Sequence, residues 1–97
     1  MRTFVTPSFQ RCLKGMAEER RAEIIAIIKR VAECYGHPHT HHGLGIRPIG
    51  PDMECRDSLN KRLVFFEENG ALCFAFYGNH DEVKRRARRK KSPRRPS

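Results

Sequence analysis

The chain has 97 residues, which is enough for one domain and too few for two. It carries 20 lysines and arginines against 11 acidic residues, so its formal net charge is +9. A domain of this size excludes catalysis between two lobes, and it suits a small nuclease, an inhibitor or a binding module. We expect no membrane-spanning segment, because no apolar run approaches the required length.

The excess positive charge is concentrated at the C-terminal end. Residues 1–83 carry 11 basic and 11 acidic side chains, whereas residues 84–97 carry nine basic side chains and no acidic ones. Such a block attracts phosphate groups by Coulomb forces and counterion release, which indicates a negatively charged partner such as RNA. A solvated tail without a ligand would have the same composition. A membrane-surface role is disfavoured, because no large apolar residues are interleaved with the basic ones.

The cysteine pattern favours a reducing compartment. Cys12, Cys34, Cys55 and Cys73 form no C-x-x-C pair, and a free cysteine packs as a small buried hydrophobe. The first residues show no pattern of a secretory signal. We therefore expect free thiols and a cytoplasmic location.

The first third of the chain predicts a short strand followed by two helices. Residues 2–6 form the strand, and Thr6 can cap a helix in which Pro7 takes the first position. Residues 17–35 predict a longer helix that ends at Gly36. Apolar residues recur at helical spacing in both helices: Phe9, Cys12, Leu13 and Met16, then Ile24, Ile27, Ile28, Val31 and Tyr35. Two helices with a short connection indicate a helical hairpin that lies on a sheet.

A histidine-rich loop spans residues 36–43. Its spacing, H-P-H-T-H-H, matches no standard zinc arrangement. The loop can be an exposed segment that binds nickel or zinc weakly, or one of its histidines can lie near a nucleic-acid groove. We assign no metal to these four residues: His37, His39, His41 and His42.

Four short segments after this loop predict strands: residues 44–49, 53–57, 62–68 and 71–77. Pro48 places the first of them at a sheet edge. Asn69-Gly70, between the last two, is the strongest short signal for a β-hairpin. Those two strands are apolar on both faces, which is typical of central strands.

The C-terminal segment predicts a last helix. Asn79 and Glu82 have the spacing of a capping box, and basic residues at the far end suit the helix dipole. The element order is then β-α-α-β-β-β-β-α, an α+β fold. We expect one domain over residues 1–89 and a basic, disordered tail over residues 90–97.

Arg56, Lys61, Arg62 and His80 are the candidate site residues. The hairpin brings Arg62 and His80 towards the same end of the sheet, and Arg56 lies on the preceding strand. RNA cleavage requires groups that move protons and cations that stabilise the phosphorane, and His and Arg supply both. The same residues also fit a purely structural role, with His80 as a helix-start residue and Arg62 as a surface strand residue.

Four segments together resemble the RelE/ParE superfamily of bacterial type II toxins. They are the R-L-V-F-F strand at 62–66, the Asn69-Gly70 hairpin, the G-N-H-D-E-V segment at 78–83 and the H-G-L-G-I-R segment at 42–47. The resemblance covers roughly residues 1–89. It implies a twisted antiparallel sheet with a helical hairpin packed on one face and a short C-terminal helix.

The resemblance also implies a function. RelE-like toxins enter the ribosomal A site and cleave mRNA with basic side chains and no metal. By this resemblance Arg62 stabilises the transition state, His80 acts as acid or base, and Arg56 and Lys61 bind RNA. We add the basic residues of the last helix to the RNA-binding set: Arg85, Arg86, Arg88 and Arg89.

The resemblance further implies the partners. Family toxins are neutralised by a cognate antitoxin protein, so we expect an antitoxin, the ribosome and mRNA as partners. We expect no cofactor, no membrane partner and no small-molecule substrate.

Two departures from the family pattern leave alternatives open. Several RelE-type nucleases carry a tyrosine in the last helix, and this chain has none after His80. Glu54 lies where some relatives carry a basic residue, and it could serve as the base. The alternatives are a ParE-like inhibitor of DNA gyrase, which would not require Arg62 with His80, and a catalytically silent nucleic-acid-binding module that acts through its tail.

Overall fold

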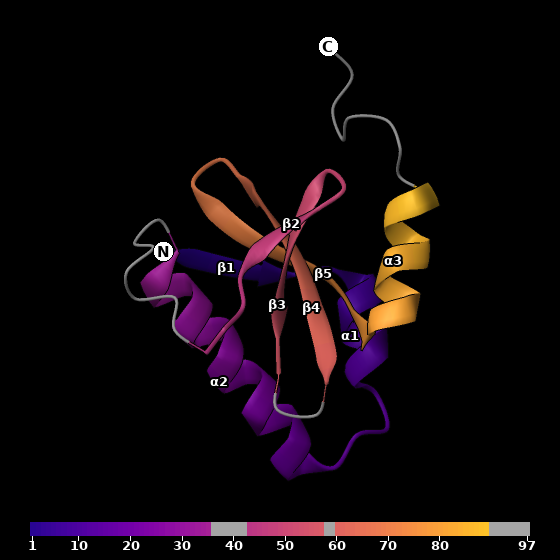
Figure 1. Ribbon diagram of the computed structural model, residues 1–97. Coiled ribbons are helices and arrows are strands. Elements are labelled where there is room, and N and C mark those ends of the chain that lie inside the picture. The colour runs from indigo at the N-terminus through magenta and orange to yellow at the C-terminus, as the bar shows by residue number, and fades with distance from the viewer. Residues whose placement is uncertain (36–42, 58–59, 90–97) are drawn as a thin grey trace.

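A computed structural model describes residues 1–35, 43–57 and 60–89 (Figure 1). Its elements follow the predicted order: β1 (Arg2–Val5), α1 (Pro7–Leu13), α2 (Glu18–Cys34), β2 (Arg47–Ile49), β3 (Asp52–Arg56), β4 (Lys61–Glu68), β5 (Ala71–Asn79) and α3 (His80–Arg89). The predicted tail, residues 90–97, lies outside the described residues. So does the histidine loop, except for its last residue, Gly43.

Five strands form one sheet in the order β1-β5-β4-β3-β2. The strands β2 to β5 pair antiparallel with their neighbours, whereas β1 pairs parallel with β5. The predicted α+β architecture is confirmed, and the parallel edge makes the sheet mixed rather than purely antiparallel. Pro48 lies in the edge strand β2, as its missing N–H group requires.

Local sequence signals determine where the elements begin and turn. The Thr6 hydroxyl accepts a hydrogen bond from the Phe9 N–H at 3.1 Å, so Thr6 caps α1 and Pro7 begins it. Asn69 and Gly70 adopt φ values of 54° and 76°, which the tight turn between β4 and β5 requires. The predicted helix start and hairpin are therefore confirmed.

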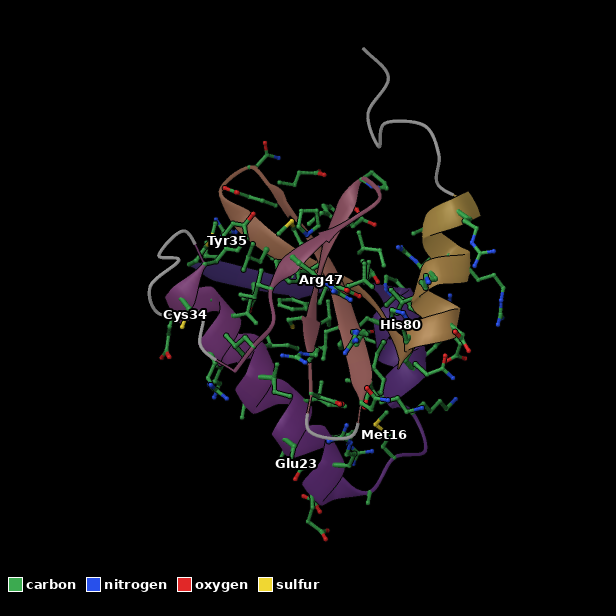
Figure 2. All side chains as sticks on the ribbon, viewed as in Figure 1. Met16, Glu23, Cys34, Tyr35, Arg47 and His80 are labelled. Carbon is green, nitrogen blue, oxygen red and sulfur yellow. The ribbon has the colours of Figure 1, made fainter. Side chains whose placement is uncertain are left out.

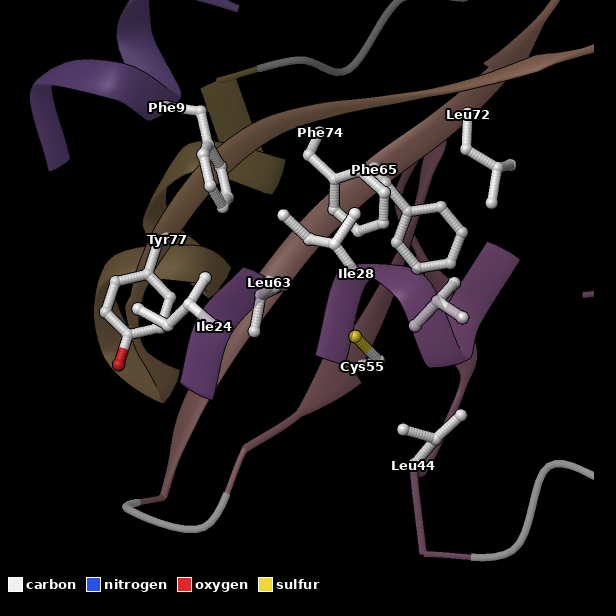
Figure 3. Close-up of a cluster of buried hydrophobic side chains, with 11 residues drawn as sticks. Phe9, Ile24, Ile28, Leu44, Cys55, Leu63, Phe65, Leu72, Phe74 and Tyr77 are labelled. Atoms are coloured by element: carbon white, nitrogen blue, oxygen red, sulfur yellow. The ribbon is translucent and has the colours of Figure 1, made fainter. Parts of the chain in front are cut away.

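The hydrophobic core lies between the sheet and the helices α1 and α2 (Figure 3). From the sheet come Leu63, Phe65 and Phe74, and from the helices come Phe9 and Ile24; all five are fully buried. The Phe9 and Phe65 rings pack on Phe74, with centroids 6.1 Å and 5.1 Å from it. Burial of these rings holds the helical hairpin on one face of the sheet and leaves the other face for α3.

The helix α3 packs on β4 and β5 from the opposite side. Its Val83 is 1% exposed, and its Arg86 forms an ion pair with Asp52 of β3 at 3.1 Å. The Arg86 guanidinium also lies over the Phe76 ring, 5.6 Å from the centroid. None of the helices in the described part of the chain is both long and apolar enough to cross a membrane.

Candidate functional site

The sheet register places four charged side chains on the face opposite the helical core. Arg56 lies directly across from Arg62, which in turn pairs with Gly78. Arg47 lies across from Glu54, two residues before Arg56 on the same strand. Directly opposed residues share a face and alternate residues return to it, so these side chains belong to one surface.

The three arginines among these side chains line a pocket of about 250 Å³. Arg47 contributes from β2, Arg56 from β3 and Arg62 from β4, and Gly45 and Ile46 complete the lining. Gly45 has φ +61°, and a Cβ there would lie 2.5 Å from Nε of Arg56. Glycine is thus required both by the backbone and by the close approach of Arg56 to the pocket wall.

Glu54 is the buried counter-charge beneath this pocket. It is 1% exposed, and its Oε2 accepts a hydrogen bond from Nε of Arg47 at 2.5 Å. Its Oε1 lies 3.6 Å from Nε of Arg62, an ion pair too long for a hydrogen bond. A buried carboxylate requires such partners, because transfer from water without them is costly.

Arg62 has buried donors that make no hydrogen bond within the described chain. It is 9% exposed, and neither its Nε nor its Nη1 has a hydrogen-bond partner among the described residues. Buried guanidinium donors without partners are costly, and the acceptor paired with Nε is Oε1 of Glu54, 3.6 Å from it. Because Arg62 also lines the pocket, its guanidinium can contribute positive charge to an anion bound there. The fork of an arginine matches the oxygens of a phosphate or carboxylate.

His80 lies at the same end of the sheet as Arg62. It follows Gly78, the register partner of Arg62, by two residues and opens α3 (Figure 2). Its Nδ1 is buried and has no hydrogen-bond partner in the described part of the chain. The structure therefore brings the two predicted catalytic residues to one end of the sheet.

The capping box of α3 holds His80 in place. The Asn79 side chain accepts from the Glu82 N–H at 2.8 Å, and the Glu82 carboxylate accepts from the Asn79 N–H at 2.8 Å. A Cβ on Gly78 would lie 2.8 Å from Oε1 of Glu82 and 2.9 Å from the Phe76 ring. The helix thus starts against the sheet without room for a side chain at this glycine.

The remaining predicted RNA-binding residues divide into two groups. Lys61 is the first residue of β4 and pairs with Asn79. Strand alternation puts it on the face opposite Arg62. Arg86 is partly buried by its contacts with Asp52 and Phe76, and burial lowers its pKa. Neither residue lines the arginine pocket, since Lys61 faces away from it and Arg86 belongs to the packing of α3. Among the α3 side chains that the structure describes, the exposed arginines are Arg85 and Arg88.

Sequence reasoning did not select Arg47 for the site. Its only signal was its place at the end of the H-G-L-G-I-R segment, before a proline that marks an edge strand. The assignment depends on the register of β2 against β3, which pairs Arg47 with Glu54. Glu54 was considered as a base, and the structure instead buries it between two arginines.

The pocket as a whole can bind an anion. Three guanidinium groups and one carboxylate leave an excess of positive charge, in a site partly shielded from water. Within residues 1–35, 43–57 and 60–89, no group of three His, Cys, Asp or Glu side chains is placed to hold a metal ion. The four histidines of the loop, to which the sequence analysis assigns no metal, lie outside this range.

Comparison with known proteins gives a fold. No protein-family model and no curated protein sequence matches this chain. Among solved structures, a chain of the RelB–RelE antitoxin–toxin complex from Methanococcus jannaschii superposes with a TM-score of 0.59 at 17% identity, over 86% of this chain and 96% of that chain. The chain has a RelE-like fold.

A second solved structure agrees with this assignment. It is the conserved hypothetical protein HP0894 from Helicobacter pylori, with a TM-score of 0.56 and 18% identity. The alignment covers 84% of this chain and 96% of HP0894. The two likenesses span nearly the whole of both neighbours, so the RelE-like fold describes the domain and not a fragment of it.

Proposed function

We propose that this chain is the toxin of a type II toxin–antitoxin module and cleaves mRNA on the ribosome, which inhibits translation. One observation carries the proposal. On a RelE-like fold, Arg47, Arg56 and Arg62 line one pocket at the end of the sheet where His80 begins α3. RNA cleavage requires cationic groups that bind the phosphate and a group nearby that transfers protons.

The proposed chemistry is attack of a ribose 2′-oxygen on the adjacent phosphorus. The bond to the leaving 5′-oxygen breaks, and a cyclic phosphate forms. Arg62, which lines the pocket, stabilises the negative charge that builds on the phosphorane oxygens. His80 transfers one proton, either from the 2′-hydroxyl or to the leaving oxygen, and solvent water accepts or supplies the other, so the protons balance. The reaction as written needs no cofactor.

The proposed partners follow from the same assignment. The M. jannaschii neighbour belongs to an antitoxin–toxin complex, which supports a cognate antitoxin for this chain. Lys61, Arg85, Arg88 and Arg89 remain candidates for contacts with ribosomal or messenger RNA outside the pocket. A toxin that acts on translating ribosomes works in the cytoplasm, so we propose that location.

The test is induced expression of the wild type and of the double variant Arg62→Ala/His80→Ala, followed by primer extension on cellular mRNA. We expect new cleavage ends within translated regions for the wild type. Loss of the proton-transfer group alone lowers such a rate by about 10²–10⁴-fold, so the double variant should leave the mRNA intact. Arg11→Ala, an exposed change on α1 away from the pocket, is the matched control and should cleave like the wild type.

Two results would contradict the nuclease. Growth arrest with intact mRNA and accumulated DNA breaks would indicate a ParE-like inhibitor of DNA gyrase. Absence of arrest, with RNA binding that depends on residues 90–97 and not on Arg62 or His80, would indicate a silent binding module.

A further inference from the structure

We propose that Glu54 is a positioning residue that holds Arg47 and Arg62 as a clamp for one phosphate group of the RNA backbone. We refer to these two side chains as the arginine clamp. The identity of the ligand as RNA rests on the proposed function. The clamp itself follows from the contacts of the three side chains.

The carboxylate of Glu54 lies between the two guanidinium groups. Its Oε2 is 2.5 Å from Nε of Arg47 on one neighbouring strand, and its Oε1 is 3.6 Å from Nε of Arg62 on the other. Both arginines therefore meet the carboxylate through Nε. Each guanidinium has further N–H groups on its Nη atoms, and both side chains line the pocket. Nη1 of Arg62 is buried, so the remaining Nη groups are the ones that can serve a ligand there.

Burial makes the carboxylate a fixed point. The Glu54 side chain is 1% exposed and that of Arg62 is 10% exposed, whereas the Arg47 side chain is 57% exposed. An arginine this exposed would otherwise occupy many rotamers, and a ligand would have to order it. The bond to a buried carboxylate removes that freedom before the ligand arrives, which is pre-organisation.

The charges of the pocket suit a reaction in which negative charge grows. Arg47, Arg56 and Arg62 carry three positive charges, and Glu54 removes one of them. A phosphodiester carries one negative charge, and the phosphorane formed by attack carries more. Glu54 weakens the attraction between the pocket and the phosphodiester substrate, and it holds the arginine donors in place. More of the binding energy is therefore realised in the transition state, where the negative charge is larger.

The same contacts argue against Glu54 as the general base. A base must reach the proton that it removes, directly or through one water. Glu54 is almost fully buried, and both of its oxygens face arginines. Its effect on cleavage should therefore pass through the arginine clamp.

The first test uses inorganic phosphate as the probe and the full chain without ribosomes. Arginine side-chain NMR should show that phosphate shifts the Nε–Hε signals of Arg47 and Arg62 in the wild type. Glu54→Gln keeps the shape and removes the charge, so we expect phosphate to bind about fivefold more tightly. Arg47→Gln should abolish the phosphate shift at Arg62, and the control Arg11→Gln should change nothing.

The second test measures cleavage of mRNA on programmed ribosomes at saturating toxin. Glu54→Gln should lower the maximal rate by about 100-fold, because the two guanidinium groups lose the charged partner that holds them, without raising the toxin concentration that gives half of that rate. Arg47→Gln, at an exposed side chain, should also lower the rate. A thermal melt of each variant excludes unfolding as the cause.

The two tests separate the clamp from the proposed function. Phosphate shifts at Arg47 and Arg62 without mRNA cleavage by the wild type would reject the nuclease and retain the clamp. Absence of those shifts, or a Glu54→Gln variant with wild-type affinity and rate, would overturn the clamp. A parallel loss of affinity, rate and thermal stability would also overturn it, since that result indicates a structural role.

Discussion

At the scale of single residues, Asp57 joins the end of β3 to α2 and β5. Its side chain is 0% exposed and forms an ion pair with Arg20 of α2. It accepts hydrogen bonds from the Tyr77 hydroxyl at 2.7 Å and from the Lys61 N–H at 2.9 Å. Arg56 directly precedes Asp57, so this carboxylate also fixes where one arginine of the pocket leaves the strand.

Two buried side chains that can lose a proton, Tyr77 and Cys55, make stability fall in the alkaline pH range. Burial, reinforced by the hydrogen bond to Asp57, raises the pKa of Tyr77 to about 12, and burial raises the pKa of the Cys55 thiol to about 12. The ordinary pKa values are near 10 for tyrosine and 9 for cysteine. Both folded-state pKa values are raised, so their contribution is fully present below pH 9 and is lost as the pH rises towards 12.

We therefore predict that the free energy of unfolding falls between pH 9 and pH 12. Urea unfolding under reducing conditions across this range measures it. Tyr77→Phe should destabilise the protein at pH 8, because buried Asp57 loses a hydrogen-bond donor, by about 1–3 kcal/mol. The same variant should have a weaker pH dependence from pH 10 upward. An unchanged slope in Tyr77→Phe would show that Tyr77 does not titrate with unfolding.

At the scale of elements, α3 depends on how it begins. Its first turn is closed by the reciprocal bonds of Asn79 and Glu82, and its middle is held by Val83 and by the ion pair of Arg86 with Asp52. These contacts stabilise a helix that packs on β4 and β5, the strands that carry Arg62 and its partner Gly78. The position of His80 at the same end of the sheet as Arg62 is thus a property of the helix start.

We predict that Asn79→Ala destabilises the domain by about 1 kcal/mol, because the first turn loses its cap. Hydrogen exchange should show faster opening of the α3 amides and little change in α2. Glu82→Gln is the matched control, since its amide oxygen can still accept from the Asn79 N–H. Equal exchange rates in Asn79→Ala and the wild type would mean that packing alone holds the helix.

At the scale of the whole molecule, charge is divided between a balanced domain and a basic end. Residues 1–83 carry equal numbers of basic and acidic side chains, and the net charge of +9 equals the nine basic side chains of residues 84–97. Within the domain, the arginine pocket concentrates positive charge on one face of the sheet. We infer that the basic end promotes encounter with RNA and that the pocket selects the phosphate.

We predict that removal of residues 90–97 weakens RNA binding without abolishing cleavage at saturating toxin. The deletion removes four basic side chains: Lys90, Lys91, Arg94 and Arg95. The slope of log affinity against log salt concentration should become shallower by up to about 3 for a single-stranded RNA. Binding to a fluorescent RNA oligonucleotide at several salt concentrations measures the slope. Unchanged binding would show that the tail makes no phosphate contacts.

The sequence by itself determined the order of the elements and most of their ends. Thr6, Pro7, Asn69, Gly70 and the capping box act on their immediate neighbours, so their effects can be read without knowledge of the fold. Apolar spacing likewise identified the buried faces of the helices and the central strands. The hairpin turn also placed Arg62 and His80 near one end of the sheet, because a two-residue turn determines the register next to it. A register shift between Val64 and Phe65, which the sequence did not reveal, then pairs Arg62 with Gly78.

Only the tertiary structure decided which charges meet. Arg47 and Glu54 depend on the pairing of β2 with β3, and the parallel position of β1 joins residues far apart in the chain. Lys61 lies on the opposite face from Arg62, although the two are neighbours in sequence, because successive strand residues alternate. Ion pairs form between residues whose distance is determined by the packing of whole elements, and local sequence does not encode that distance.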